Sequence, residues 1–304
     1  MTQSRRFLPL AIAALLIAAI GWQLYATREP SYQGKTLTKW LDEGYGVRPP
    51  PSADIGNPEE ALHAIGKAAI PSLMRMLKAK DSRLKYRFFE WLESHSIMSL
   101  SPWPALLRRM QASKALMVLG PEARNAFPEM VQLFQDPVLA YDVAPAMAKI
   151  SPAAIPVLRS GLSNQEQRVR TAAIWGLRHG GTNAWVAMPE VVSALGDRSP
   201  MVRKAAVFAL ASFGQEPATV LPALWKSAQE DLDSDVRVSA ISAIGCFGQR
   251  AAAFAPRLQE LLASTNLPDN LLVAQMTNAL QKIKPSALDK TATPPADSAT
   301  HAPP

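Results

Sequence analysis

The chain has 304 residues, of which 48% are hydrophobic and 19% charged, so it can form a core, and wholesale disorder is excluded. Its net charge is +7, but basic residues are interspersed with acids and no run of five or more occurs, which makes the charge a weak indication of nucleic acid or an anionic membrane surface. The single cysteine, Cys246, excludes an intrachain disulfide and a cysteine-based metal site.

The first predicted element is an apolar helix. After a tail at residues 1–6, residues 7–26 carry almost no polar group and are long enough to cross a bilayer, with Arg5 and Arg6 directly before them. We expect a single-pass signal-anchor that leaves the rest of the chain on the periplasmic or extracytoplasmic side. A cleaved signal peptide is the alternative, because Ala19 and Gly21 in the segment Ala-Ile-Gly supply small residues at plausible cleavage positions. A buried core helix is the third interpretation.

Residues 27–56 are predicted to be a linker. They contain the segment Tyr-Gln-Gly-Lys-x-Leu-x-x-Trp-Leu at 32–41 and, further on, three successive prolines at 49–51. The prolines indicate a stiff, extended spacer.

A repeat follows, marked first by prolines. Apolar pairs precede a proline at Pro71, Pro128, Pro156, Pro189, Pro222 and Pro256, and from Pro128 onward the intervals are 28, 33, 33 and 34 residues. Because proline is tolerated in the first turn of a helix, each mark predicts a helix start.

A second mark keeps the same period. A Val-Arg pair ends at Arg170, Arg203 and Arg237 and is followed each time by a helix of small and apolar residues. Asp197 and Asp231 lie in the turns before two of these helices, where a carboxylate can cap the helix N-terminus. Glycines at 66, 120, 180, 214 and 248 end the helices. The unit is therefore a helical hairpin, and stacked hairpins bury a shared core.

This pattern resembles the HEAT-repeat family over residues 57–285 and is most regular over residues 152–248. The resemblance implies an all-α fold, a right-handed α-solenoid of stacked helical hairpins. With the span predicted from residues 7–26, this solenoid lies behind one N-terminal transmembrane helix. It also implies a ladder of ion pairs between repeats, formed by Arg170, Arg203, Arg237, Asp197 and Asp231. Residues 286–304 have the composition of a disordered tail.

The segment at 32–41, between an apolar N-terminus and HEAT repeats, is similar to one in a group of bacterial membrane-anchored repeat proteins. That likeness implies a bacterial envelope setting and no particular activity.

The sequence shows no catalytic motif. The four histidines are far apart, and no metal-binding, nucleophile-elbow or nucleotide-binding pattern occurs, so we predict no enzyme, no cofactor and no metal. Cys246 lies among small and apolar residues and is predicted to be buried.

Two aromatic residues at equivalent positions suggest a binding face. Trp175 and Phe208 each lie five residues after a ladder arginine, with Arg178 and Lys204 near the same face. Aromatic residues and arginines are enriched at binding hot spots. These four residues either contact a partner or, for the rings, fill the grooves between repeats.

The leading hypothesis is a non-enzymatic scaffold that binds a protein partner of unknown identity, with nucleic acid and small-molecule substrates disfavoured. The alternatives are an enzyme or accessory factor of the HEAT-like bilin lyase type and a nucleic-acid-binding HEAT protein.

Overall fold

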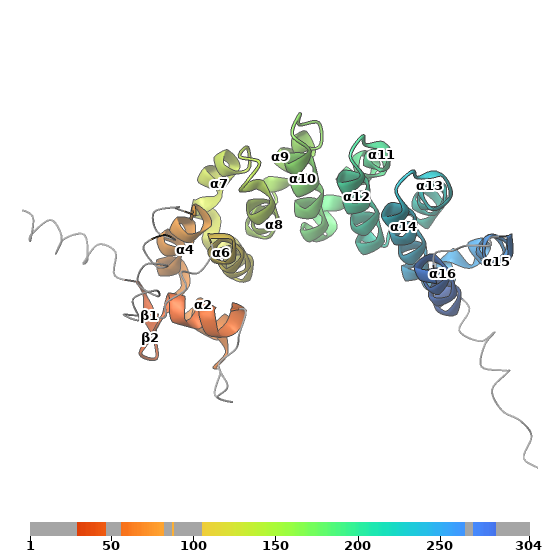
Figure 1. Cartoon of the computed structure of the whole chain (residues 1–304). Coiled ribbons are helices and arrows are strands. Elements are labelled where there is room, and N and C mark those ends of the chain that lie inside the picture. Colours follow the sequence, from red (N-terminus) through yellow and green to blue (C-terminus); the bar gives the residue numbers. More distant parts are fainter. Residues whose placement is uncertain (1–28, 47–55, 82–86, 88–104, 265–269, 284–304) are drawn as a thin grey trace, which may run out of the picture. The chain divides into compact units, whose positions relative to one another are not determined.

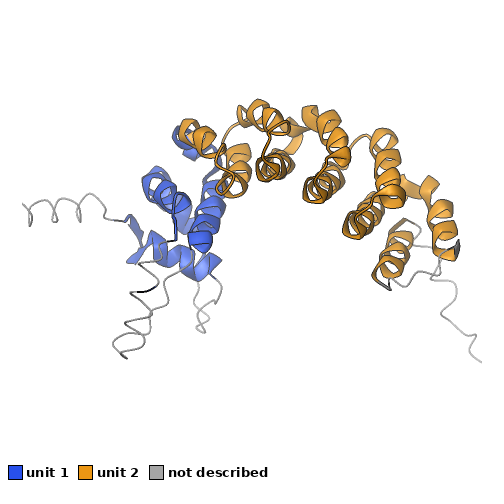
Figure 2. Cartoon of the chain, turned by 45° about the horizontal axis from the view of Figure 1, so that its top comes forward, with its two compact units in different colours: residues 1–126 blue, residues 127–304 orange. Residues whose placement is uncertain are grey.

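The computed structural model describes residues 29–46, 56–81, 87, 105–264 and 270–283, and every structural statement below concerns these residues (Figure 1). They divide into two compact units, residues 1–126 and residues 127–304 (Figure 2). The predicted membrane span at 7–26 and the predicted tail at 286–304 lie outside the described residues.

The first unit begins with a small hairpin and then becomes helical. Its elements are β1 (Ser31–Tyr32), β2 (Lys35–Thr36), α2 (Leu37–Tyr45), α3 (Pro58–Ile65), the 3-10 helix η1 (Gly66–Ala69), α4 (Ile70–Leu77), α6 (Ala105–Leu119) and η2 (Gly120–Ala126).

Part of the expected linker is a folded element, and its sequence explains why. Gln33 and Gly34 form the two-residue turn between the antiparallel strands β1 and β2, with φ of 49° and 75°, as a type I′ turn requires. Leu37, Trp40 and Leu41 are buried, and the Trp40 indole donates to the Tyr32 carbonyl at 3.0 Å. The segment at 32–41 therefore belongs to the folded unit.

The second unit is a succession of helical hairpins. Its first helices are α7 (Phe127–Leu133), α9 (Ala154–Gly161), α11 (Met188–Ser193) with η4 (Ala194–Gly196), α13 (Pro217–Glu230) and α15 (Ala255–Ser264). Its second helices are α8 (Ala140–Ile150), α10 (Gln167–His179), α12 (Pro200–Phe213), α14 (Ser234–Cys246) and α16 (Asn270–Ile283). The 3-10 helices η3 (Gly181–Ala187) and η5 (Gly248–Phe254) connect successive hairpins.

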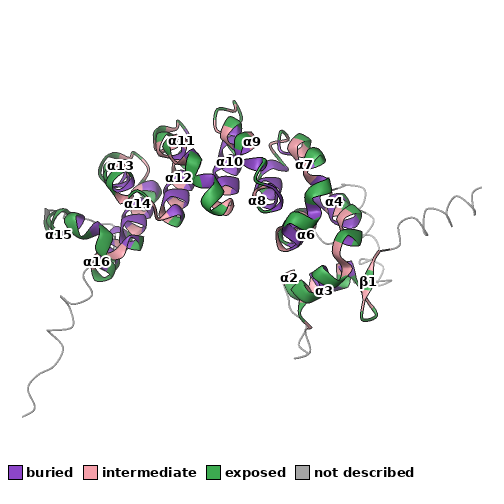
Figure 3. Ribbon diagram, turned by 180° about the vertical axis from the view of Figure 1, so that it is seen from behind, coloured by how far each residue is buried: buried purple, intermediate pink, exposed green. Residues whose placement is uncertain are grey.

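Each first helix packs against its own second helix, and each second helix packs against the next one along the chain. Buried residues gather where the second helices meet their neighbours (Figure 3). The all-α stack of hairpins is thereby confirmed, whereas its right hand remains a prediction.

Glycine ends most second helices as expected. Gly214, for example, has φ of 58°, a left-handed conformation that L side chains rarely adopt. Gly180 caps α10 as expected, but its φ is −75°, and the next residue, Gly181, takes the left-handed conformation with φ of 60°. α10 nevertheless ends at His179, directly before Gly180, where the glycine pattern predicts.

In the described part of the chain, no single helix has the length and apolarity needed to span a bilayer. Two consecutive helical stretches, Ser234–Cys246 and Gly248–Ala263, meet those criteria only when taken together, across a bend of 119°.

Candidate functional site

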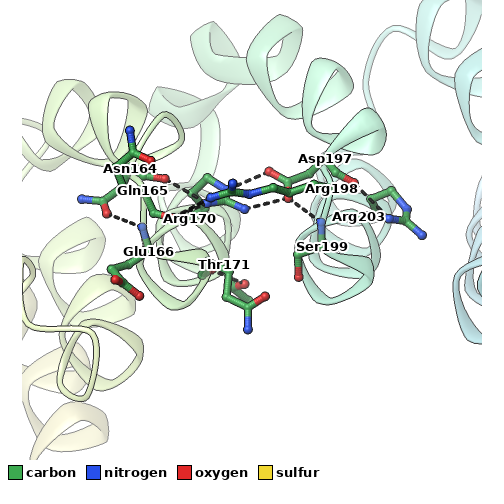
Figure 4. A network of polar contacts seen from close by, with 10 residues as sticks. Asn164, Gln165, Glu166, Arg170, Thr171, Asp197, Arg198, Ser199 and Arg203 are labelled. Carbon is green, nitrogen blue, oxygen red and sulfur yellow. Dashed lines mark hydrogen bonds and ion pairs between the residues drawn. The ribbon is translucent and has the colours of Figure 1, made fainter.

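Arg170, at the start of α10, makes a network of polar contacts between two repeats (Figure 4). Its Nε and Nη2 donate to the two carboxylate oxygens of Asp197, at 2.8 and 2.9 Å. Its Nη1 donates to the backbone carbonyls of Asn164 and Gln165, both at 2.9 Å. A guanidinium satisfied in this forked manner joins one turn to the next with defined geometry.

The next repeat contains the same arrangement. Arg203 of α12 donates from Nε and Nη2 to Asp231, at 2.7 and 2.6 Å, and from Nη1 to the Asp197 carbonyl at 2.9 Å. Arg237 of α14 donates to the Asp231 carbonyl at 2.8 Å. The sequence position equivalent to Asp197 and Asp231, where its carboxylate partner would be expected, falls near residues 265–269, outside the described residues.

The two carboxylates of the ladder have lowered pKa values and are therefore ionised at neutral pH. Burial raises the pKa of Asp197, but hydrogen bonds from Arg170 and the Ser199 backbone N–H outweigh it, so the pKa lies below its ordinary value. The pKa of Asp231 is lowered in the same way, by hydrogen bonds from Arg203 and the Asp233 backbone N–H. Both carboxylates link neighbouring repeats, and their oxygens already accept hydrogen bonds from groups of the protein.

Beside the ladder, the second helices carry a row of aromatic rings. Trp175 of α10 and Phe208 of α12 are half-buried, with ring centroids 6.2 Å apart and planes inclined by 30°. Tyr141 of α8 extends the row: its ring meets Trp175 edge-on, with centroids 6.1 Å apart. We call Tyr141, Trp175 and Phe208 the aromatic row. The rings bridge the grooves between neighbouring helices and still leave part of their surface exposed.

The predicted cations of this face differ in their contacts. The Arg178 guanidinium lies 4.9 Å from the Trp175 ring centroid, a cation–π arrangement. Lys204 pairs with Asp235 of α14, with Nζ 2.9 Å from the carboxylate oxygen. Arg178 is therefore part of the aromatic row's surroundings, and Lys204 links α12 to α14.

Sequence reasoning missed several residues of this face. Tyr141 is 51% exposed, and it precedes Trp175 by nearly the interval that separates Trp175 from Phe208, a signal that could have found it. Next to it lies a groove of about 190 Å³, lined in part by Val138, Arg168 and Met201. Val138 and Met201 are exposed apolar side chains, and no periodic pattern in the sequence singles them out.

Two titratable groups lie near the cations of this face. Burial lowers the pKa of His179, and the charges of Arg178 and Lys149 lower it further. Burial likewise raises the pKa of Tyr141, with Arg178 acting in the opposite direction and Asp142 in the same direction. Arg178 and Lys149 therefore place positive charge near His179.

The expectation that Cys246 is buried is wrong, because its side chain is exposed at the end of α14. Within the described ranges no group of three His, Cys, Asp or Glu residues lies close enough to hold a metal ion.

Comparisons with known proteins address the fold. The family described as HEAT repeats matches residues 155–245, within the stretch whose repeat is most regular. No curated protein matches the chain at sequence level. Solved structures similar to the chain include the complex of CpcE and CpcF of phycocyanin lyase from a Nostoc species, at 21% identity and a TM-score of 0.38, covering 84% of this chain and 97% of that one. They also include human deoxyhypusine hydroxylase in complex with glycerol, at 16% identity and a TM-score of 0.30, covering 73% of this chain and 98% of that one.

These structures correct one prediction. The sequence led us to exclude an enzyme, yet the similar structures come from a lyase complex and a hydroxylase. The prediction of no enzyme is thus withdrawn; the lack of a linear catalytic motif does not by itself exclude an enzyme, since residues distant in sequence can converge in a fold.

The identity of the repeats rests on three observations that agree: the proline and Val-Arg periodicity, the stacked hairpins of the second unit, and the family match. Residues 155–245 match the HEAT-repeat family and form stacked helical hairpins.

Proposed function

We propose that this protein binds a partner polypeptide on the face formed by α8, α10 and α12. The observation that carries the proposal is the aromatic row, whose three rings come from successive helices and remain partly exposed. A packing role alone does not call for such exposure, whereas aromatic side chains with a neighbouring arginine supply much of the binding energy at protein interfaces.

The adjoining groove supports the same face. Val138 is 54% exposed and Met201 62% exposed, and both line the groove that Tyr141 borders. Together with the aromatic row they form a continuous apolar surface of the kind that marks an interaction site. Successive repeats extend such a surface along the stack, which suits an elongated partner.

The test is affinity capture of the tagged full chain from solubilised native membranes, with Trp175→Ala/Phe208→Ala compared with wild type. We expect the double variant to keep its helical circular dichroism and lose at least ten-fold of the recovered partner, because two hot-spot rings are removed. Trp185→Ala is the matched control, since Trp185 is 38% exposed but lies in the connector η3. Equal recovery with all three proteins would return the rings to a packing role and overturn the proposal.

A role as a bilin-lyase-type enzyme or an enzyme's accessory factor is the second candidate. It draws on the same face, because an accessory subunit must hold a protein substrate or a catalytic subunit. Identification of the captured partner by mass spectrometry, followed by an assay of that partner's modification with and without this chain, distinguishes it from simple scaffolding. Modification that is independent of the chain would eliminate this candidate.

The site of action is a separate proposal: residues 7–26 tether the repeats to a membrane, on its extracytoplasmic side. The uncharged stretch after Arg5 and Arg6 supports it. Alkaline carbonate extraction and protease accessibility in spheroplasts test it, and a chain released by carbonate or protected from protease would contradict it.

A further inference from the structure

The helices of the proposed binding face carry an excess of positive charge. Between them, α8, α10 and α12 contain one acidic residue, Asp142, which is 6% exposed, whereas their basic residues are Lys149, Arg168, Arg170, Arg178, Arg203 and Lys204. The exposed charged side chains within these three helices are therefore basic, and Glu166, the N-cap residue of α10, adds one exposed carboxylate beside them.

Half of these cations are neutralised within the protein. Arg170 and Arg203 are committed to the ladder aspartates, and Lys204 pairs with Asp235. The other three, Lys149, Arg168 and Arg178, form no ion pair with any residue in the described part of the chain. Their charge is available to a ligand.

The free cations flank the apolar surface. Arg168 lines the groove with Val138 and Met201, about two helical turns before Trp175 on α10. Arg178 stacks on the other side of Trp175, one turn later, and its charge reaches both Tyr141 and His179. A ligand lying along this face would thus meet positive charge, apolar surface and positive charge in turn.

We infer that the partner segment is an extended acidic peptide, whose apolar side chains contact the aromatic row and the groove while its carboxylates pair with Arg168, Arg178 and Lys149. This inference rests on the proposed function and adds the chemistry of the partner. Charge complementarity of this kind selects the partner and speeds association, whereas the buried apolar contacts hold it.

A polypeptide fits better than a nucleic acid. The three free cations are few for a phosphate backbone, whose binding depends on many Lys and Arg contacts. Exposed Val138 and Met201 offer apolar contacts that phosphate and sugar cannot use. Nucleic acid and anionic lipid are accordingly controls in the test.

The experiment selects peptides from a random 12-residue phage library on the immobilised full chain in detergent. We expect the selected peptides to be enriched in Asp and Glu and to carry aromatic or aliphatic residues between them. Their dissociation constants are then measured by fluorescence anisotropy against wild type and three variants.

The first variant, Arg168→Gln/Arg178→Gln, should weaken binding about 4- to 25-fold, from roughly 2- to 5-fold for each exposed ion pair lost. The second, Trp175→Ala/Phe208→Ala, should weaken it by at least ten-fold. The third, Arg257→Gln, is the matched control and should change nothing, because Arg257 also stacks on a ring, Phe254, but lies on α15. Raising the salt concentration should weaken binding to wild type more than to the first variant.

The outcomes separate the two proposals. Two outcomes would overturn the acidic partner and leave the proposed function standing. In the first, peptides that depend on the aromatic row are neutral or basic; in the second, they bind Arg168→Gln/Arg178→Gln as tightly as wild type. Failure to select any peptide that depends on the aromatic row would overturn both. Tighter binding of a labelled single-stranded oligonucleotide, or of phosphatidylserine vesicles, than of the best peptide would also overturn the inference.

Discussion

Gly245 of α14 lies so close to Ala279 of α16 that a Cβ atom at position 245 would stand 2.9 Å from the Ala279 Cα atom. The obstacle is backbone, which cannot rotate aside as a side chain can. We expect Gly245→Ala to lower the free energy of unfolding by about 1–3 kcal/mol, the usual cost of overpacking. Urea denaturation followed by circular dichroism measures it.

Gly196→Ala is the control for this prediction. No atom lies within 4 Å of the Cβ that it would add, and its backbone is outside the left-handed region. We expect no loss of stability, and a gain of up to about 1 kcal/mol from the less flexible unfolded chain. Equal losses for both variants would show that helix-to-helix distance is not the cause.

Removal of a ladder arginine should be costly. In Arg170→Met the aliphatic volume is retained, but the carboxylate of Asp197, 13% exposed, loses both of its guanidinium hydrogen bonds. We expect a loss of about 3 kcal/mol, because breaking a mostly buried pair leaves one charge without its partner. Lys204→Met, at the more exposed pair with Asp235, should cost less than about 1 kcal/mol. A similar effect of the two substitutions would contradict a structural role for the ladder.

The ladder also makes stability depend on acid pH. The pKa of Asp197 and of Asp231 is lower in the folded protein than in the unfolded chain, where it is about 3.9. The folded state therefore binds fewer protons, so the stabilisation is present above about pH 5 and is lost as pH falls through the folded pKa values. Urea midpoints measured from pH 7 to pH 2.5 should fall in the acid range. Asp197→Asn should be less stable at pH 7 and show a shallower acid decline; a parallel decline would rule out this carboxylate.

Exposure of Cys246 gives a chemical test of the register of α14. The side chain is exposed in the folded protein, although its neighbour Gly245 is buried. We expect a thiol reagent such as DTNB to modify the folded chain nearly as fast as the chain in urea. Modification only after unfolding would place Cys246 in the core and the helix in a different rotation.

The helical repeat itself could be read directly from the residues. Pro189 marks a helix start and Gly214 a helix end, because each residue has its own backbone preferences. Arg203 recurs one repeat length after the equivalent Arg170. Such local signals can be interpreted without knowing which helix packs against the segment. The short segment at 32–41 also has a local turn signal, since Gln33-Gly34 forms the turn that brings Tyr32 to Trp40. Only the tertiary contacts show that this segment packs as part of the first unit.

Only part of the candidate site could be predicted from the sequence. Trp175, Phe208 and Arg178 could be placed on one face from helical spacing, and the repeat interval could also have placed Tyr141 there. The groove at Met201 could not be assembled from spacing.

The sequence by itself determined which segments are helices, where they turn back and with what period they repeat, because those properties depend on residues close together in the chain. Only the tertiary structure decided which side chains of neighbouring helices meet and which stay exposed. Cys246 shows why: exposure depends on the rotation of a helix about its axis and on its distance from the next helix, as at Gly245 and Ala279. These quantities are set by packing across the whole stack rather than by any local pattern.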